Sequence, residues 1–155
     1  MLQLGKRELE RIYKQAADEY PAECCGILSR AGGEEDVRVH PCENIQDRLH
    51  AEDPEKHPRD ARIAYFIEPQ ELYDIISAAE RSGGSVAGFY HSHIDCDAYF
   101  SDEDKERAMV WGEPAYPEAV YLVVSLYEGS VRGYKCFSWD EGARDFVAVD
   151  LAVAE

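Results

Sequence analysis

Two histidines and an aspartate in one short stretch of the chain could together hold a divalent metal ion. His91 and His93 lie in HSHIDCDAYFSDED, and Ser101 and Asp104 follow in the same stretch. Side chains two residues apart on a strand point to the same face, and a carboxylate in the first turn of a following helix can return to them. Zinc binds imidazole nitrogen and carboxylate oxygen, and a catalytic zinc usually keeps three protein ligands and one open position. The pattern therefore predicts a catalytic metal site made by His91, His93 and Asp104.

A simpler interpretation of the same residues stays open. Polar histidines can end a strand without binding an ion, and Ser101 with Asp104 has the spacing of a helix capping box. Either half of the pattern alone would favour this interpretation. The two halves together favour a metal site.

Glu23 is the candidate proton carrier for such a site. A hydrolase that activates water needs a side chain that moves the proton of the water to the leaving group. Glu23 lies in YPAECCGIL, after a helix-ending Tyr20 and Pro21 and before an apolar run that indicates a buried strand. We therefore expect its carboxylate at the edge of a buried strand. The alternative is an ordinary solvent-exposed loop glutamate.

These residues resemble the JAMM (MPN-plus, Mov34/MPN) zinc metalloprotease family. The family pattern is an upstream glutamate, HxH, seven residues, serine, two residues and aspartate, and PAECCGIL, GFYHSH, Ser101 and Asp104 fill every position. The resemblance covers roughly the whole chain and points to the short prokaryotic type. It implies that His91, His93 and Asp104 bind zinc. It also implies that Glu23 is the general acid/base and that Ser101 donates to the oxyanion.

The resemblance implies a zinc-dependent peptidase or isopeptidase that hydrolyses an amide bond. Short family members are similar to bacterial peptidases that process the C-terminal tails of ubiquitin-like sulfur-carrier proteins, so the expected partner is a protein or peptide with an extended tail. One departure is Ile94, where many members have proline, and it concerns the rigidity of the loop more than the chemistry. The alternative is a non-catalytic or autoinhibited MPN-type binding module, which the complete ligand set disfavours.

Other enzyme classes fit the residues less well. A zinc nucleoside deaminase needs HxE and PCxxC, whereas this chain has HSH and PCEN. Neither a GxGxxG nor a GxxxxGK[ST] stretch is present. A Cys/His hydrolase that used Cys24 or Cys25 would leave the spacing of HxH and Asp104 unexplained.

Composition narrows the setting in which this chemistry would take place. The 155 residues, 45% of them hydrophobic, suffice for one sizeable core, so we expect a single metallopeptidase domain over residues 1–155. An N-terminus charged within a few residues and the lack of a long apolar run lead us to expect a cytoplasmic protein. The net charge of −16 argues against nucleic acid or an anionic membrane as the partner. Five cysteines without a CxxC pair indicate reduced, mostly buried thiols.

Hydrophobic periodicity predicts the elements that position the site. We expect an α/β fold, a mixed β-sheet with helices packed on it in cytidine-deaminase-like or MPN-type α-β-α layers. The expected helices are 7–20, one opened by Pro69, and one capped by Ser101 that reaches about Trp111. The expected strands are 24–30, 36–42, 63–67, 85–90, 119–126, 130–139 and 145–153. Residues 43–61 lack periodicity and are expected to form a long loop.

Two segments near the motif keep open interpretations. The small side chain of Cys96 is expected to pack the loop, and a fortuitous metal ligand is the alternative. Asp95 and Asp97 are expected to face solvent or the loop backbone. The loop 43–61 either borders the substrate groove or is a mobile insertion remote from the site.

Overall fold

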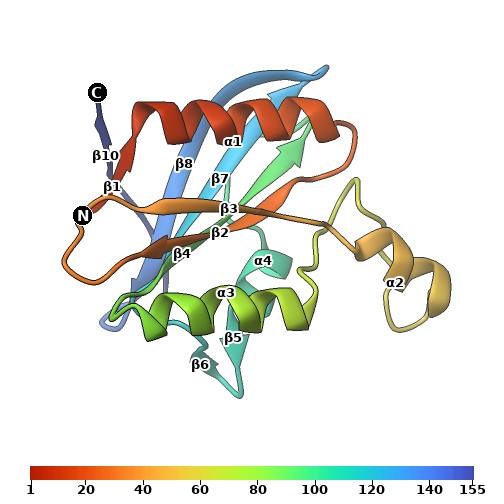
Figure 1. The fold of residues 1–155 in the computed structure, drawn as a ribbon. Coiled ribbons are helices and arrows are strands. Elements are labelled where there is room, and N and C mark those ends of the chain that lie inside the picture. The colour runs from red at the N-terminus through yellow and green to blue at the C-terminus, as the bar shows by residue number, and fades with distance from the viewer.

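A central β-sheet with helices on both faces organises the structure, a computed structural model that describes residues 1–155 (Figure 1). The strands are β1 Leu2–Gly5, β2 Cys25–Arg30, β3 Arg38–Cys42, β4 Ser85–Ile94, β5 Met109–Val110, β6 Glu113–Pro114, β7 Val120–Tyr127, β8 Ser130–Asp140, β9 Asp145–Val149 and β10 Leu151–Ala154. The helices are α1 Lys6–Glu19, α2 Gln46–Glu52, α3 Pro69–Arg81 and α4 Asp102–Arg107. None of these helices combines the length and the apolar character needed to cross a membrane.

The main sheet is mixed, as the sequence predicts. Its six strands have the order β3-β2-β4-β7-β8-β9. The central pair β4 and β7 is parallel, and the other neighbouring pairs are antiparallel. Strands β1 and β10 form a separate parallel pair, and β5 and β6 form a short hairpin. The expected α/β fold class is therefore confirmed.

Two hydrophobic cores lie on the two faces of the sheet. Helix α1 packs on one face through Leu9, Ile12 and Ala16, which share one helical stripe. Helix α3 covers the other face, so α1 and α3 lie on opposite sides in Figure 1. Because successive side chains of a strand point to opposite faces, Tyr90 enters the α1 core and Phe89 enters the α3 core. The same alternation sends His91 and His93 to the face of α3 and α4.

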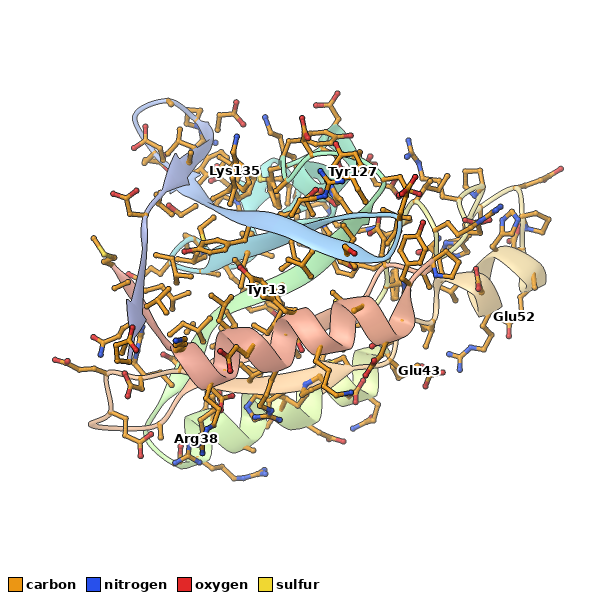
Figure 2. All side chains as sticks on the ribbon, turned by 90° about the horizontal axis from the view of Figure 1, so that it is seen from above. Tyr13, Arg38, Glu43, Glu52, Tyr127 and Lys135 are labelled. Atoms are coloured by element: carbon orange, nitrogen blue, oxygen red, sulfur yellow. The ribbon has the colours of Figure 1, made fainter.

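The segment 43–67 differs from the expectation. Residues 43–61 contain helix α2, so the prediction of a long loop without structure is wrong there. This segment, called the 43–67 excursion below, projects beyond the sheet, and Figure 2 shows Glu52 on its outer side. The strand predicted at 63–67 is also wrong, because only Ile67 forms an isolated bridge, with Asn44. The Asn44 side chain bonds the backbone of this stretch, which gives these backbone groups partners outside a strand ladder.

Two further boundaries differ from the expectation. Helix α4 ends at Arg107 and does not reach Trp111. The chain continues into β5 and β6, whose turn has Trp111 and Gly112 at positive φ, as a tight hairpin turn requires. The single strand predicted at 145–153 is divided into β9 and β10, and β10 leaves the main sheet to pair with the unexpected β1.

Candidate metal centre

The structure brings the three predicted ligands together. The Nε2 atoms of His91 and His93 each lie 3.1 Å from Oδ2 of Asp104 and 3.2 Å from one another. All three side chains are buried, and together they form a group that could hold a metal ion. The two histidines come from the end of β4, and the aspartate comes from the first turn of α4.

The first turn of α4 fixes the aspartate through a capping box. The Asp104 amide donates to Ser101 Oγ at 3.0 Å, and the Ser101 amide donates to Asp104 Oδ2 at 3.0 Å. The capping-box interpretation of this spacing is therefore correct. It is also compatible with a metal site, because the same Oδ2 atom faces both histidines.

The protonation of these groups fits a bound cation. His93 Nδ1 lies 3.0 Å from the carbonyl oxygen of Asp97, which can only accept, so Nδ1 carries a proton and Nε2 is the ring nitrogen that faces His91 and Asp104. Burial lowers the pKa of His91 despite the nearby carboxylate, which favours its neutral form. Burial opposes ionisation of Asp104, yet the two histidines outweigh it and hold the pKa of this carboxyl below its usual range. Nitrogen and oxygen atoms that converge from three buried side chains could hold a positive ion between them.

Two tyrosines hold the imidazole rings. Tyr65 stacks on His91 with ring centroids 4.5 Å apart, and Tyr99 meets His93 edge-on at 4.9 Å. Tyr65 is buried, whereas Tyr99 is exposed. Sequence reasoning missed both residues, since Tyr65 lies in the segment wrongly predicted as a strand. The ring contacts restrict the orientation of the two ligands.

Glu23 lies inside the protein beside this group, at 5% exposure. Cys25 pairs with His91 across β2 and β4, and Glu23 lies two residues before Cys25. Burial raises the pKa of Glu23 well above its usual value, and the negative charges of Asp104 and Glu103 add to this. The alternative of a solvent-exposed loop glutamate is therefore wrong.

The loop that follows β4 is tied to its neighbours by its acidic residues. The Tyr20 hydroxyl donates to Asp95 at 3.0 Å, and the Tyr127 hydroxyl, whose position Figure 2 marks, donates to Asp97 at 2.7 Å. Both residues are exposed, as expected, and their carboxylates also bond neighbouring elements. The backbone carbonyl of Asp97 also contacts Nδ1 of His93. The hydrogen bond from Tyr127 to Asp97 therefore helps to hold the His93 ring in place.

Cys96 lies in the same loop without joining the ligand group. Its carbonyl accepts a hydrogen bond from the Ser125 hydroxyl at 2.5 Å, and its side chain is half-buried. Burial, with the charges of Glu23 and neighbouring carboxylates, raises the pKa of the Cys96 thiol. The group of possible metal ligands does not include its sulfur, so the packing role expected from the sequence fits better.

A charged network lies next to Asp104 on α4, with Glu103 and Arg107 half-buried and Arg59 exposed. Arg107 donates to Gln46 Oε1 at 3.0 Å and to Glu103 at 3.3 Å, and Arg59 forms an ion pair with Glu103 at 2.5 Å. The positive charges of Arg107 and Arg59 oppose the rise in the pKa of Glu23. Sequence reasoning did not single out these residues. The spacing of Glu103 and Arg107, four positions apart on a helix, was the available signal.

A mostly apolar cavity of about 190 Å³ adjoins the site. Its wall includes Tyr65, which stacks on His91, and Arg107, which lies one turn after Asp104. The remaining lining residues are Phe66, Ile67, Pro69, Leu72, Phe89, Ala108, Tyr116 and Tyr121. Sites for small molecules usually measure roughly 300–1,000 Å³, so this volume is suited to a single side chain rather than a whole small ligand.

Comparison with known proteins gives a consistent assignment. The family described as prokaryotic homologs of the JAB domain matches residues 5–140. The desampylase of Haloferax volcanii is 37% identical over 121 residues, which are 76% of this chain and 72% of that protein.

Solved structures show the same fold. A solution structure from Desulfitobacterium hafniense matches with a TM-score of 0.69 and 22% identity, covering 100% of this chain and 94% of that one. A JAB1/MPN domain protein from Archaeoglobus fulgidus matches with a TM-score of 0.56 and 18% identity over 99% of both chains. From the family match and the desampylase relative, the chain belongs to the prokaryotic JAB-domain family and is a JAMM-type hydrolase.

Proposed function

We propose that this protein is a zinc-dependent isopeptidase or peptidase that hydrolyses an amide bond in the extended C-terminal tail of a ubiquitin-like protein, such as a sulfur carrier. The observation that carries the proposal is the buried carboxyl of Glu23 beside three converging electron-pair donors. The relative named desampylase acts on a ubiquitin-like protein, which supports the substrate class. A cytoplasmic location is part of the proposal.

Zinc is the metal that we propose for His91, His93 and Asp104. Two imidazoles with one carboxylate are a ligand set of zinc hydrolases, and the buried Nε2 and Oδ2 atoms are the donors. A zinc ion held there would supply Lewis-acid activation of a water molecule and of the scissile carbonyl.

Glu23 would transfer the proton in this reaction. Its raised pKa brings the carboxyl closer to the pH at which an enzyme operates, which favours both uptake and release of a proton. It would take the proton of the attacking water and deliver it to the departing amine. Its burial excludes bulk water from this transfer.

Ser101 would stabilise the oxyanion. Its Oγ accepts the Asp104 amide proton, so its own hydroxyl proton stays free to donate to another group. A hydroxyl placed next to a metal ligand can direct this proton at the charge that develops on the substrate carbonyl.

The cavity beside Tyr65 would hold an apolar side chain of the substrate tail. Its size, apolar lining and contact with the ring that stacks on His91 favour this role. Residues at the start and the end of the 43–61 segment contact the backbone of Glu23, which supports a place beside the site over an insertion remote from it. That this segment borders the substrate remains a proposal.

The test uses zinc-loaded protein and a panel of ubiquitin-like proteins that carry a C-terminal extension or an isopeptide-linked peptide. Loss of the extension, followed by intact mass, is expected with the wild-type protein and not after chelation. The matched variant Glu23→Gln should bind zinc and cleave at a rate lower by about a hundredfold or more. Equal cleavage by this variant would remove Glu23 from the mechanism. Failure of the zinc-loaded wild type on every substrate would contradict the substrate class.

A further inference from the structure

Glu23 is positioned by its backbone rather than by its side chain. Its carboxyl makes no hydrogen bond to another protein group, whereas its amide donates to the Ala61 carbonyl at 2.7 Å. Its carbonyl accepts from Asn44 Nδ2 at 2.8 Å. Strand β4 bonds the chain at the start of β2 only as far as Cys24, whose carbonyl accepts from the Ser92 amide and whose amide donates to the Ser92 hydroxyl. The segment outside the sheet therefore determines where Glu23 lies.

Asn44 is the centre of this attachment. Besides the Glu23 carbonyl, its Nδ2 donates to the Ala64 carbonyl at 3.1 Å. Its Oδ1 accepts from the amides of Gln46 at 3.0 Å and Phe66 at 3.1 Å. An asparagine amide offers two donor hydrogens and one carbonyl oxygen with two lone pairs, so all of its capacity is used. Two carbonyls on one side and two amides on the other require asparagine, because aspartate cannot donate.

We infer that Asn44 is a positioning residue for catalysis: it fixes the backbone of Glu23 and thereby sets the carboxyl against the metal ligands. The inference rests on the proposed role of Glu23 as the proton carrier. A base misplaced by about 1 Å can lose on the order of a hundredfold in rate, so an anchor of the backbone has a direct kinetic consequence.

The anchor is separate from the metal ligands. His91 and His93 belong to β4, and Asp104 belongs to α4, and Asn44 hydrogen-bonds none of them. Loss of the anchor should therefore change proton transfer without releasing the metal. A second set of hydrogen bonds, the second arm of the anchor, links Asp47 to Glu23 through Ala61. Asp47 Oδ1 accepts from the Ala61 amide at 2.7 Å, and the Ala61 carbonyl accepts from the Glu23 amide.

The main test is Asn44→Asp, which keeps the shape and both acceptor contacts but removes both donors. We expect about one zinc per chain, a KM within about threefold of wild type, and a kcat lower by roughly 10- to 100-fold. Asn44→Ala adds no charge and should lower kcat in the same direction. The matched control is Gln15→Glu, which removes a comparable hydrogen bond, 3.0 Å long, from a side-chain amide to the carbonyl of Cys25 at the start of β2. This control should keep kcat.

A double-variant cycle separates positioning from a general loss of structure. If Asn44 acts through Glu23, then Asn44→Asp should lower kcat by less than about twofold in a Glu23→Gln background. A kcat within twofold of wild type in zinc-loaded Asn44→Asp overturns the inference. The inference is also overturned if the fold loss of kcat in the double variant equals the product of the fold losses in the two single variants.

Two further outcomes have defined meanings. If Asn44→Asp does not fold, Asp47→Ala tests the second arm of the anchor. A several-fold lower kcat with zinc retained in Asp47→Ala supports the inference. An unchanged kcat in that variant overturns it. If Glu23→Gln alone keeps full activity, the proposed function loses its proton carrier and the inference falls with it. That result differs from an active Asn44→Asp beside an inactive Glu23→Gln, which overturns the inference alone.

Discussion

Replacing Glu23 with glutamine should stabilise the metal-free protein while it removes activity. The carboxyl is 5% exposed, and burial raises its pKa well above the usual value, with Asp104 and Glu103 raising it further. Arg107 and Arg59 offset this only in part. Glutamine has nearly the same shape and no charge, so it removes the cost of a buried, poorly compensated carboxylate.

The sign and size of the effect follow from proton linkage. The unfolded chain releases the Glu23 proton near the ordinary pKa of 4.5, and the folded protein keeps it to higher pH. The stabilising contribution of the Glu23 proton to the folded wild-type protein is therefore fully present below pH 4.5. This contribution is lost as the pH rises through the pKa of Glu23 in the folded protein. Each pH unit that separates the folded from the unfolded pKa of a group corresponds to about 1.4 kcal/mol of free energy of unfolding. For a chain of this length, each such unit shifts Tm by roughly 3–5 °C.

Thermal melts of chelated wild-type and Glu23→Gln protein at about pH 4 and pH 8 measure this difference. The variant should match the wild type at the lower pH and melt higher at the upper pH, and added zinc should reduce the gap because a cation favours the carboxylate. Glu52→Gln, on the exposed side of α2, is the control and should stay within about 0.5 kcal/mol. A Glu23→Gln protein that melts no higher than wild type at pH 8 would refute the reasoning.

Three further predictions concern the metal, the cap and the excursion. His93→Ala or Asp104→Ala should reduce zinc from about one ion per chain to a small fraction by metal analysis, and undiminished zinc in both would contradict the ligand assignment. Ser101→Ala should lower kcat by about 10²- to 10³-fold and destabilise the protein by about 1 kcal/mol in denaturant titrations, since it removes both a donor and a helix cap. Wild-type kcat in that variant would exclude the oxyanion role. Shortening residues 52–56 should raise KM or change substrate choice with zinc content intact, and unchanged kinetics would show that the excursion does not guide substrate.

The site could be predicted because its main features are local in sequence. The HxH spacing puts two imidazoles on one face of β4, and the Ser101 cap turns Asp104 towards them. The apolar run after Glu23 indicated a buried strand, and the structure confirms the burial of that carboxyl. The roles of these residues, the single domain and the cytoplasmic location stay predictions.

The missed features depend on contacts between residues far apart in the chain. Residues 63–67 form a short apolar run like that of a buried strand, yet the side chain of Asn44 takes up their backbone groups. The contact of Tyr65 with His91 needs the same segment to fold over the site. The spacing of residues in the sequence does not specify such partners, because a side-chain amide that replaces a strand leaves no periodic signal.

The pairing of β1 with β10 has a consequence for the order of folding. Leu2 lies opposite Leu151, and Leu4 lies opposite Val153, so almost the whole chain separates the partners. During synthesis β1 must wait until residue 154 has left the ribosome before this pair can form. Leu2 and Leu4 also belong to the core beneath α1 and would stay incompletely covered during that interval. A nascent chain stalled before β10 should therefore bind chaperones, although β2, β4 and β7 and all three candidate metal ligands have already been synthesised.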